Sequence, residues 1–220
     1  ASPYVSVTAL EDGGYAIVWQ QEENGNPPDI FVAVYDATGA VSPAPINVSS
    51  TPSLYESLSE QDITPLPDGG FLVSWSGQIS GGRSDAFFAL YSAGGQETMS
   101  ATNVSNDPST SSDRVFTNVL SDGSIAITWS ERGTDGTANL FTSVYDADGQ
   151  LVLSPSQVTS VASRGVASPY VSVTALEDGG YAIAWQQEEN ANPSDIFVAV
   201  YDATGAVSPA PINVSSTPSL

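Results

Sequence analysis

The sequence contains no cysteine, no histidine and no lysine among its 220 residues. Without cysteine the chain has no disulfide framework, no thiolate zinc site and no cysteine nucleophile. Without histidine it has no Ser-His-Asp triad. It also has no apolar run long enough to span a bilayer, so we expect no membrane insertion.

Positive charge is almost absent, because 4 basic residues stand against 25 acidic ones and the formal net charge is −21. Such a chain repels phosphate backbones, which excludes nucleic acid as a partner. Divalent cations screen this charge well, and Ca²⁺ is therefore the one candidate cofactor. The Cys-free, Asp-rich composition favours an exported bacterial protein, either secreted or displayed at the cell surface.

The main organising feature is a duplication, because residues 1–54 return almost unchanged as residues 167–220. The two copies differ only at Val18/Ala184, Gly25/Ala191 and Pro28/Ser194. The second copy stops where the first runs on into further sequence, so we expect a segment of a longer array. Neither copy carries a polar capping change, which makes self-association through the terminal repeats a candidate property.

Weaker copies of the same pattern lie between the two ends. An Asp-Gly pair recurs every 54 to 56 residues, at Asp12, Asp68, Asp122 and Asp178. The sequence therefore predicts four repeats, which span residues 1–54, 55–108, 109–166 and 167–220.

Each repeat reads as four short strands, which in the first repeat are expected at residues 4–10, 15–20, 30–35 and 46–49. An Asp-Gly turn joins the first two strands. Prolines break the fourth strand, which suits a sheet edge. Four-stranded units of about 55 residues are too small for β-sandwich domains, which need about 100 residues. The predicted fold is therefore all-β and β-propeller-like, with four repeats that each form a four-stranded antiparallel blade.

Two recurring residue types have a structural interpretation that outweighs a functional one. The tryptophan of each second strand shares a strand face with apolar or aromatic residues, which favours core packing over sugar stacking. These tryptophans are Trp19, Trp75, Trp129 and Trp185. The aspartate of each Asp-Gly pair is expected to cap its own turn, while the glycine supplies the positive φ.

The pattern Leu-x-Asp-Gly-Gly-aromatic-x-Val/Ile-x-Trp, followed by Tyr-Asp-x-x-Gly, resembles repeats of very large secreted bacterial proteins. These are the haemolysin-type, or RTX-associated, surface proteins, and the resemblance covers all four repeats. It implies export, surface display and adhesion. The glycine-rich nonapeptide that binds calcium in such proteins is absent from this sequence.

Candidate site residues lie in turns and loops, where a rigid scaffold places binding groups. Asp146 and Asp148 form a two-carboxylate turn that is a fragment of a calcium loop. The loops that follow each second strand carry further ligand candidates, which are Glu22, Glu23, Asp29, Glu131 and Asp135. A charged, solvated loop or hairpin is the plainer interpretation of both groups.

The sequence shows no nucleophile–base pair, and its carboxylates fall in repeated turns. We therefore expect no enzyme, but a non-enzymatic structural or adhesive repeat module of a secreted or cell-surface bacterial protein. The alternative is a lectin-like carbohydrate-binding propeller, with a glycan as the partner. A propeller hydrolase that uses carboxylates alone is a third hypothesis.

Overall fold

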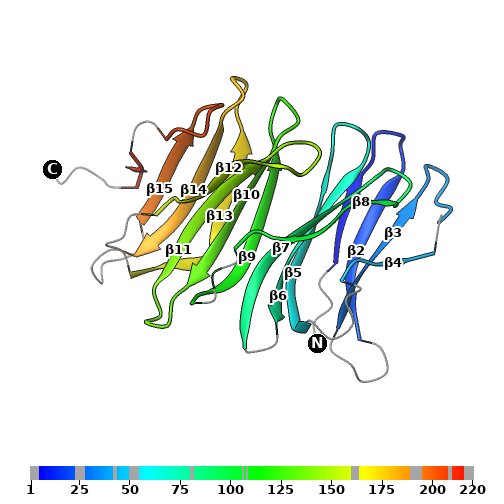
Figure 1. Cartoon of the computed structure of the whole chain (residues 1–220). Helices are drawn as coiled ribbons and strands as arrows, with labels where there is room; N and C mark the ends of the chain where they lie inside the picture. The colour runs from blue at the N-terminus through cyan, green and yellow to red at the C-terminus, as the bar shows by residue number, and fades with distance from the viewer. Residues whose placement is uncertain are drawn as a thin grey trace. The chain divides into compact units, whose positions relative to one another are not determined.

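The structure is a computed structural model that describes residues 5–22, 28–41, 44–49, 55–79, 82–105, 107, 109–159, 164–188, 195–207 and 210–215. These residues form four antiparallel sheets of four strands each, and within every sheet the strands follow chain order (Figure 1). The predicted all-β fold of four-stranded, propeller-like blades is confirmed. No helix long and apolar enough to cross a membrane occurs in the described part of the chain.

We number the sheets as blades 1 to 4 in chain order. Blade 1 contains β1 (Val5–Ala9), β2 (Tyr15–Gln21), β3 (Asp29–Tyr35) and β4 (Ile46–Asn47). Blade 2 contains β5 (Tyr55–Pro65), β6 (Phe71–Ile79), β7 (Arg83–Tyr91) and β8 (Glu97–Asn103). Blade 3 contains β9 (Ser111–Val119), β10 (Ile125–Arg132), β11 (Ala138–Tyr145) and β12 (Leu151–Gln157). Blade 4 contains β13 (Arg164–Ala175), β14 (Tyr181–Glu188), β15 (Asp195–Tyr201) and β16 (Ile212–Asn213).

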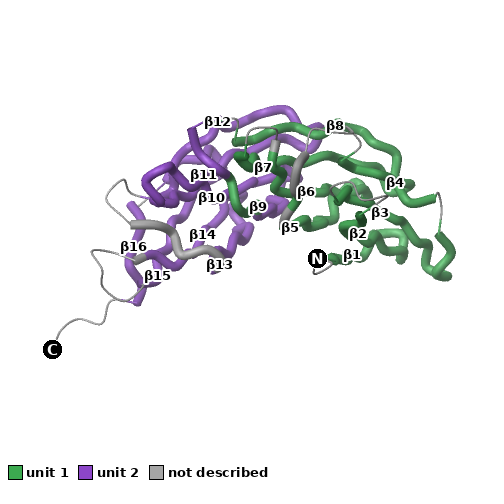
Figure 2. The backbone as a smooth tube through the Cα atoms, turned by 90° about the horizontal axis from the view of Figure 1, so that it is seen from below, with its two compact units in different colours: residues 1–108, 112–115 green, residues 109–111, 116–220 purple. Residues whose placement is uncertain are grey.

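The last blade begins before the duplicated segment does. Strand β13 begins at Arg164, three residues before the duplicated segment starts at residue 167. The chain forms two compact units (Figure 2). Unit 1 comprises residues 1–108 and 112–115, and unit 2 comprises residues 109–111 and 116–220.

The Asp-Gly turns form as the sequence predicts. The carboxylate of Asp12 accepts a hydrogen bond from the amide of Gly14 at 2.8 Å, and Gly13 has a φ of +84°. Asp68, Asp122 and Asp178 accept the corresponding bond in their own turns. Only glycine adopts this φ without strain, which explains why the pair recurs in every repeat.

Each blade has an aromatic face and an aliphatic face, because successive side chains of a strand point to opposite sides. On the aromatic face, the tryptophan of the second strand stacks on the phenylalanine of the third. In blade 2 the ring centroids of Trp75 and Phe87 are 5.7 Å apart, and in blade 4 those of Trp185 and Phe197 are 5.8 Å apart. The cross-strand register that brings these pairs together is the same in both blades.

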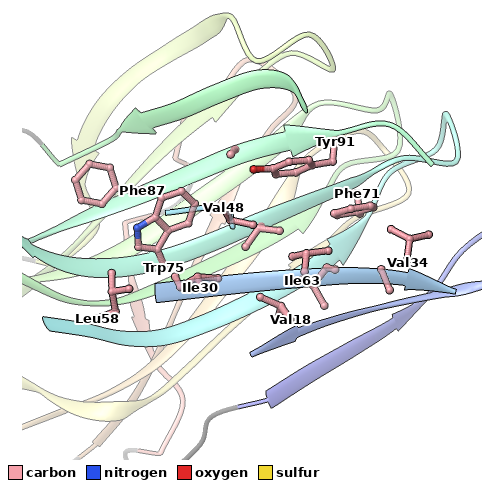
Figure 3. Close-up of a cluster of buried hydrophobic side chains, with 14 of the residues drawn as sticks. Val18, Ile30, Val34, Val48, Leu58, Ile63, Phe71, Trp75, Phe87 and Tyr91 are labelled. Atoms are coloured by element: carbon pink, nitrogen blue, oxygen red, sulfur yellow. The ribbon is translucent and has the colours of Figure 1, made fainter. Parts of the chain in front are cut away.

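The core of unit 1 lies between the aliphatic face of blade 1 and the aromatic face of blade 2. Blade 1 contributes Val18, Ile30 and Val34, and blade 2 contributes Trp75 and Phe87 (Figure 3). Unit 2 repeats this arrangement. Its core joins Ala126, Leu140 and Val144 of blade 3 with Trp185 and Tyr181 of blade 4.

Three of the four tryptophans are buried, as predicted, with Trp75, Trp129 and Trp185 at most 2% exposed. The prediction is wrong for Trp19, which is only half-buried. Its side chain lies on the aromatic face of blade 1, which no other blade covers among the described residues of unit 1.

Candidate functional site

A β-bulge interrupts the first strand of blade 2. Ser59 pairs with Ser76 and Asp62 pairs with Ser74, so Glu60 and the residue after it both lie opposite Trp75. Glu60 has a φ of +49° and is the one non-glycine residue with positive φ in the part of the chain that the structure describes. Both bulges and left-handed non-glycine residues concentrate next to functional sites.

The bulge directs an acidic side chain toward one of the four arginines. Glu60 Oε1 forms an ion pair with Arg114 Nη2 at 2.5 Å, and the two side chains are 27% and 28% exposed. Both residues belong to unit 1, since residues 112–115 of β9 are part of it. The pair is partly desolvated, yet it remains open to a ligand.

Burial raises the pKa of the Glu60 carboxyl above its ordinary value of 4.5, and the negative charge of Asp113 adds to that rise. Arg114 opposes the rise but does not cancel it. Glu60 therefore holds its proton to a higher pH than a free glutamate does. A carboxyl group shifted in this way by burial and by a specific charged neighbour is a candidate functional group.

Glu60 and Arg114 occupy the same position in successive repeats, eight residues before the aspartate of the Asp-Gly turn. The corresponding residues of the end repeats are Tyr4 and Tyr170. The middle repeats thus carry an acid and a base where both end repeats carry tyrosine. This departure from the repeat pattern is visible in the sequence, but its meaning depends on the ion pair that the fold creates.

Neighbouring polar groups are held in place around the bulge. Ser6 Oγ donates a hydrogen bond to Asp62 Oδ1 at 2.7 Å, and Gln20 Nε2 donates one to Gln61 Oε1 at 2.7 Å. Opposite the bulge, the buried indole Nε1 of Trp75 has no hydrogen-bond partner among the described residues. The bulge is therefore held to blade 1 through Asp62 and Gln61, whereas Glu60 contacts Arg114 of β9.

The ligand candidates in the first repeat have separate surroundings. Glu22 is exposed, and Glu23 lies outside the described residues. Asp29 accepts a hydrogen bond from Ser49 Oγ at 3.1 Å, and the same hydroxyl accepts one from the amide of Ile30. Asp29 thus helps to attach the end of β4 to β3, which is a structural role.

Glu131 is not in a solvated loop, as its sequence position suggested, but is buried at 5% exposure. It accepts hydrogen bonds from Trp129 Nε1 at 2.7 Å and from Thr110 Oγ1 at 3.1 Å. Gln187 accepts the equivalent bond from the indole of Trp185 in blade 4. Glu131 therefore occupies the position of Gln187 in the repeat, and its carboxylate accepts the indole hydrogen bond that the glutamine amide oxygen accepts in blade 4.

The remaining candidates lie in exposed turns that they cap themselves. Asp135 accepts hydrogen bonds from the amide and the hydroxyl of Thr137, and these bonds lower the pKa of its carboxyl. Asp146 Oδ1 accepts from the amides of Asp148 and Gln150 at 3.0 and 2.8 Å. No group of three or more potential metal ligands gathers in the described ranges, and calcium at Asp146 and Asp148 stays a prediction.

The sequence matches no protein-family model and no curated protein. The fold, in contrast, is similar to several solved structures. A thermostable family-43 glycoside hydrolase matches with a TM-score of 0.55 and 15% identity, over 97% of this chain and 72% of that one. An endo-arabinase from Bacteroides thetaiotaomicron matches with a TM-score of 0.50 and 17% identity, over 87% and 72%. A protein of unknown function from Dyadobacter fermentans matches with a TM-score of 0.63 and 12% identity, over 99% and 69%.

These similarities show that the fold is propeller-like. They also show that several proteins with a similar fold act on carbohydrates. They contradict the prediction of a non-enzymatic structural or adhesive module, and with it the prediction that the chain is not an enzyme. The reason is that the family-43 glycoside hydrolase and the endo-arabinase are both enzymes that act on glycans. The carboxylates that the sequence singles out lie in turns and loops. The fold pairs Glu60 with Arg114 outside those turns and loops, and the negative charge of Asp113 acts on Glu60 there.

Proposed function

We propose that this chain is a glycan-processing propeller that hydrolyses a neutral polysaccharide. The observation that carries the proposal is the Glu60 carboxyl, whose pKa burial raises, at a bulge beside Arg114 and Asp113. The likeness to propellers of glycoside hydrolases supports the choice of reaction.

Glycoside hydrolysis needs one carboxyl that gives a proton and one carboxylate that takes one or attacks. We assign the first role to Glu60, since its raised pKa suits a general acid. It donates its proton to the glycosidic oxygen as the bond to the anomeric carbon breaks. We assign the second role to Asp113, whose carboxylate accepts a proton from the water that attacks that carbon. Arg114 orients this protonated carboxyl, because its Nη2 donates to Oε1 and leaves Oε2 to carry the proton.

The charge of the chain limits the substrate class. With a formal charge of −21, the molecule repels polyanionic glycans, whereas neutral glycans experience no such repulsion. Arg114 does not alter this balance, because a single guanidinium is small against a net charge of −21. Neutral cell-wall polysaccharides such as arabinan and xylan lie outside the bacterial cell. With such a substrate we retain the proposal that the protein is secreted or displayed at the cell surface.

The test is the release of reducing ends from neutral polysaccharides, with arabinan as the first substrate and xylan as the second. We expect Glu60→Gln and Asp113→Asn each to lower the rate by a factor of about 100 or more, which is the usual contribution of a positioned acid or base. Glu11→Gln is the matched control, because Glu11 is exposed in a turn. No release from any neutral glycan, or equal rates for Glu60→Gln and Glu11→Gln, would overturn the proposal.

A further inference from the structure

The two nearly identical end repeats bury opposite faces. Trp185 of blade 4 is 2% exposed, whereas Trp19, the same residue of blade 1, is half-buried. The aliphatic faces show the reverse, because Ile30 of blade 1 is fully buried and Ile196 of blade 4 is 38% exposed. Since the sequences agree, the difference comes only from which face each blade packs against its neighbour.

Among the described residues of unit 1, no other blade covers the aromatic face of blade 1. The half-exposed side chains of this face are Tyr15, Ile17, Trp19, Phe31 and Tyr35. Val7 of β1 pairs with Ile17 and is 62% exposed, whereas Ile63, its equivalent in blade 2, is 5% exposed in the core of unit 1. The face is therefore apolar, ordered in a sheet and open to solvent.

Blade 4 leaves its aliphatic face uncovered in the same sense. This face consists of Ala182, Ala184, Ile196, Val198 and Val200. A hollow of about 310 Å³ lies on it, lined by Tyr170, Ser172, Gln186 and Ile196 among others. The equivalent wall of blade 1 is occupied, because Ser6 and Gln20 hydrogen-bond to Asp62 and Gln61 of β5. The hollow therefore marks the place that the first strand of another blade would fill.

The two open faces are the two sides of a contact that the chain already makes twice. In unit 1 the aliphatic face of blade 1 packs on the aromatic face of blade 2. In unit 2 the aliphatic face of blade 3 packs on the aromatic face of blade 4. None of the ten residues of the open faces is charged, although the chain has 25 acidic residues. A second copy of this chain thus offers each face its complement without opposing like charges.

We propose that copies of this chain associate head to tail, with the aliphatic face of blade 4 in one copy against the aromatic face of blade 1 in the next. The contact is heterologous, so it either closes into a ring of chains or extends. It is independent of the Glu60 site, which lies in the middle repeats.

Three valine-to-aspartate variants of similar exposure test the proposal by light scattering on the full chain. Val7→Asp charges the aromatic side, and Val214→Asp charges the aliphatic side, where its equivalent Val48 is buried in the unit 1 core. Val152→Asp is the control, since Val152 is 56% exposed on β12 of blade 3 and belongs to neither face. We expect wild type and Val152→Asp to have the mass of two or more chains, and the other two variants the mass of one.

Mixing the variants tests the direction of the contact. A chain with Val7→Asp keeps its aliphatic face, and a chain with Val214→Asp keeps its aromatic face. A head-to-tail contact therefore yields a one-to-one dimer from the mixture, although each variant alone is a monomer. A wild-type chain that stays monomeric at high concentration, or a mixture that forms no dimer while wild type associates, would overturn the proposal. Circular dichroism of each variant checks that its blades fold.

Discussion

Ile30 and Ile196 are the same residue of the same repeat, yet Ile30 is fully buried and Ile196 is 38% exposed. The sequences around them differ at only three positions over 54 residues, so the intrinsic conformational preferences of the chain are nearly the same at the two sites. The difference in burial isolates the effect of packing one blade on another. The same substitution made in both end repeats can therefore be compared directly.

The first prediction uses this pair. Ile30→Ala should lower the free energy of unfolding by about 2–5 kcal/mol, since it removes buried methyl groups and leaves a cavity. Ile196→Ala should cost less than half as much, because its side chain is already in contact with water. Denaturant unfolding of dilute protein measures both. Equal costs would show that Ile196 is buried in solution at that concentration.

The second prediction concerns the tryptophans. Trp75→Ala should lower the free energy of unfolding by about 3–5 kcal/mol, because the indole is fully buried in the core of unit 1. Trp19→Ala removes the equivalent indole from a half-exposed position and should cost clearly less. Urea titrations followed by far-UV circular dichroism compare the two. A loss under about 1 kcal/mol for Trp75→Ala would contradict its place in the core.

The third prediction separates the hydrogen bond of Glu131 from its charge. Glu131→Ala leaves the indole Nε1 of Trp129 unpaired in a buried setting and should cost about 1–3 kcal/mol. Glu131→Gln should restore most of this stability, because Gln187 accepts the same bond from Trp185. Thermal melts of the three proteins decide it. If the glutamine variant melted as low as the alanine variant, the carboxylate charge itself would be required.

The fourth prediction concerns pH. Burial raises the pKa of Glu60 in the folded chain, so the folded state binds more protons than the unfolded state between the two pKa values. The contribution of Glu60 to stability is therefore present at low pH and is lost as pH rises through its folded pKa. Glu60→Gln stays neutral throughout.

The melting temperature of wild type relative to Glu60→Gln should accordingly fall as pH increases from about 4 to about 8. Paired thermal melts across this range measure the difference, with Glu11→Gln as the control for an exposed carboxylate. A difference that increased with pH would mean that the ion pair with Arg114 outweighs burial.

The fifth prediction concerns calcium. Salt should raise the melting temperature by screening the charge of −21. The calcium site predicted at Asp146 and Asp148 requires calcium to raise the melting temperature further than sodium chloride does at equal ionic strength. Equal melting temperatures in the two salts would contradict that site. Melts in chelator, sodium chloride and millimolar calcium test this. An additional rise in calcium that Asp148→Asn abolished would establish the calcium site that the sequence predicts.

Much of this molecule could be predicted from short-range features of the sequence. Asp12 followed by Gly13 specifies a turn, because the carboxylate caps it and glycine adopts the positive φ. Alternation along β2 assigns Trp19 and Val18 to opposite faces, since successive side chains of a strand point apart. Recurrence of both features every 54 to 56 residues then yields four blades. These features act within a few residues, so the sequence alone determines them.

The tertiary structure decided which of those faces and side chains are buried, because packing joins residues far apart in the chain. Trp19 and Trp185 have nearly the same sequence neighbours, and only the adjoining blade makes one half-exposed and the other buried. Glu60 and Arg114 are 54 residues apart, and the bulge in β5 together with the start of β9 brings them into an ion pair. No local sequence pattern predicts this ion pair, since desolvation and charge pairing arise only when separate strands come together.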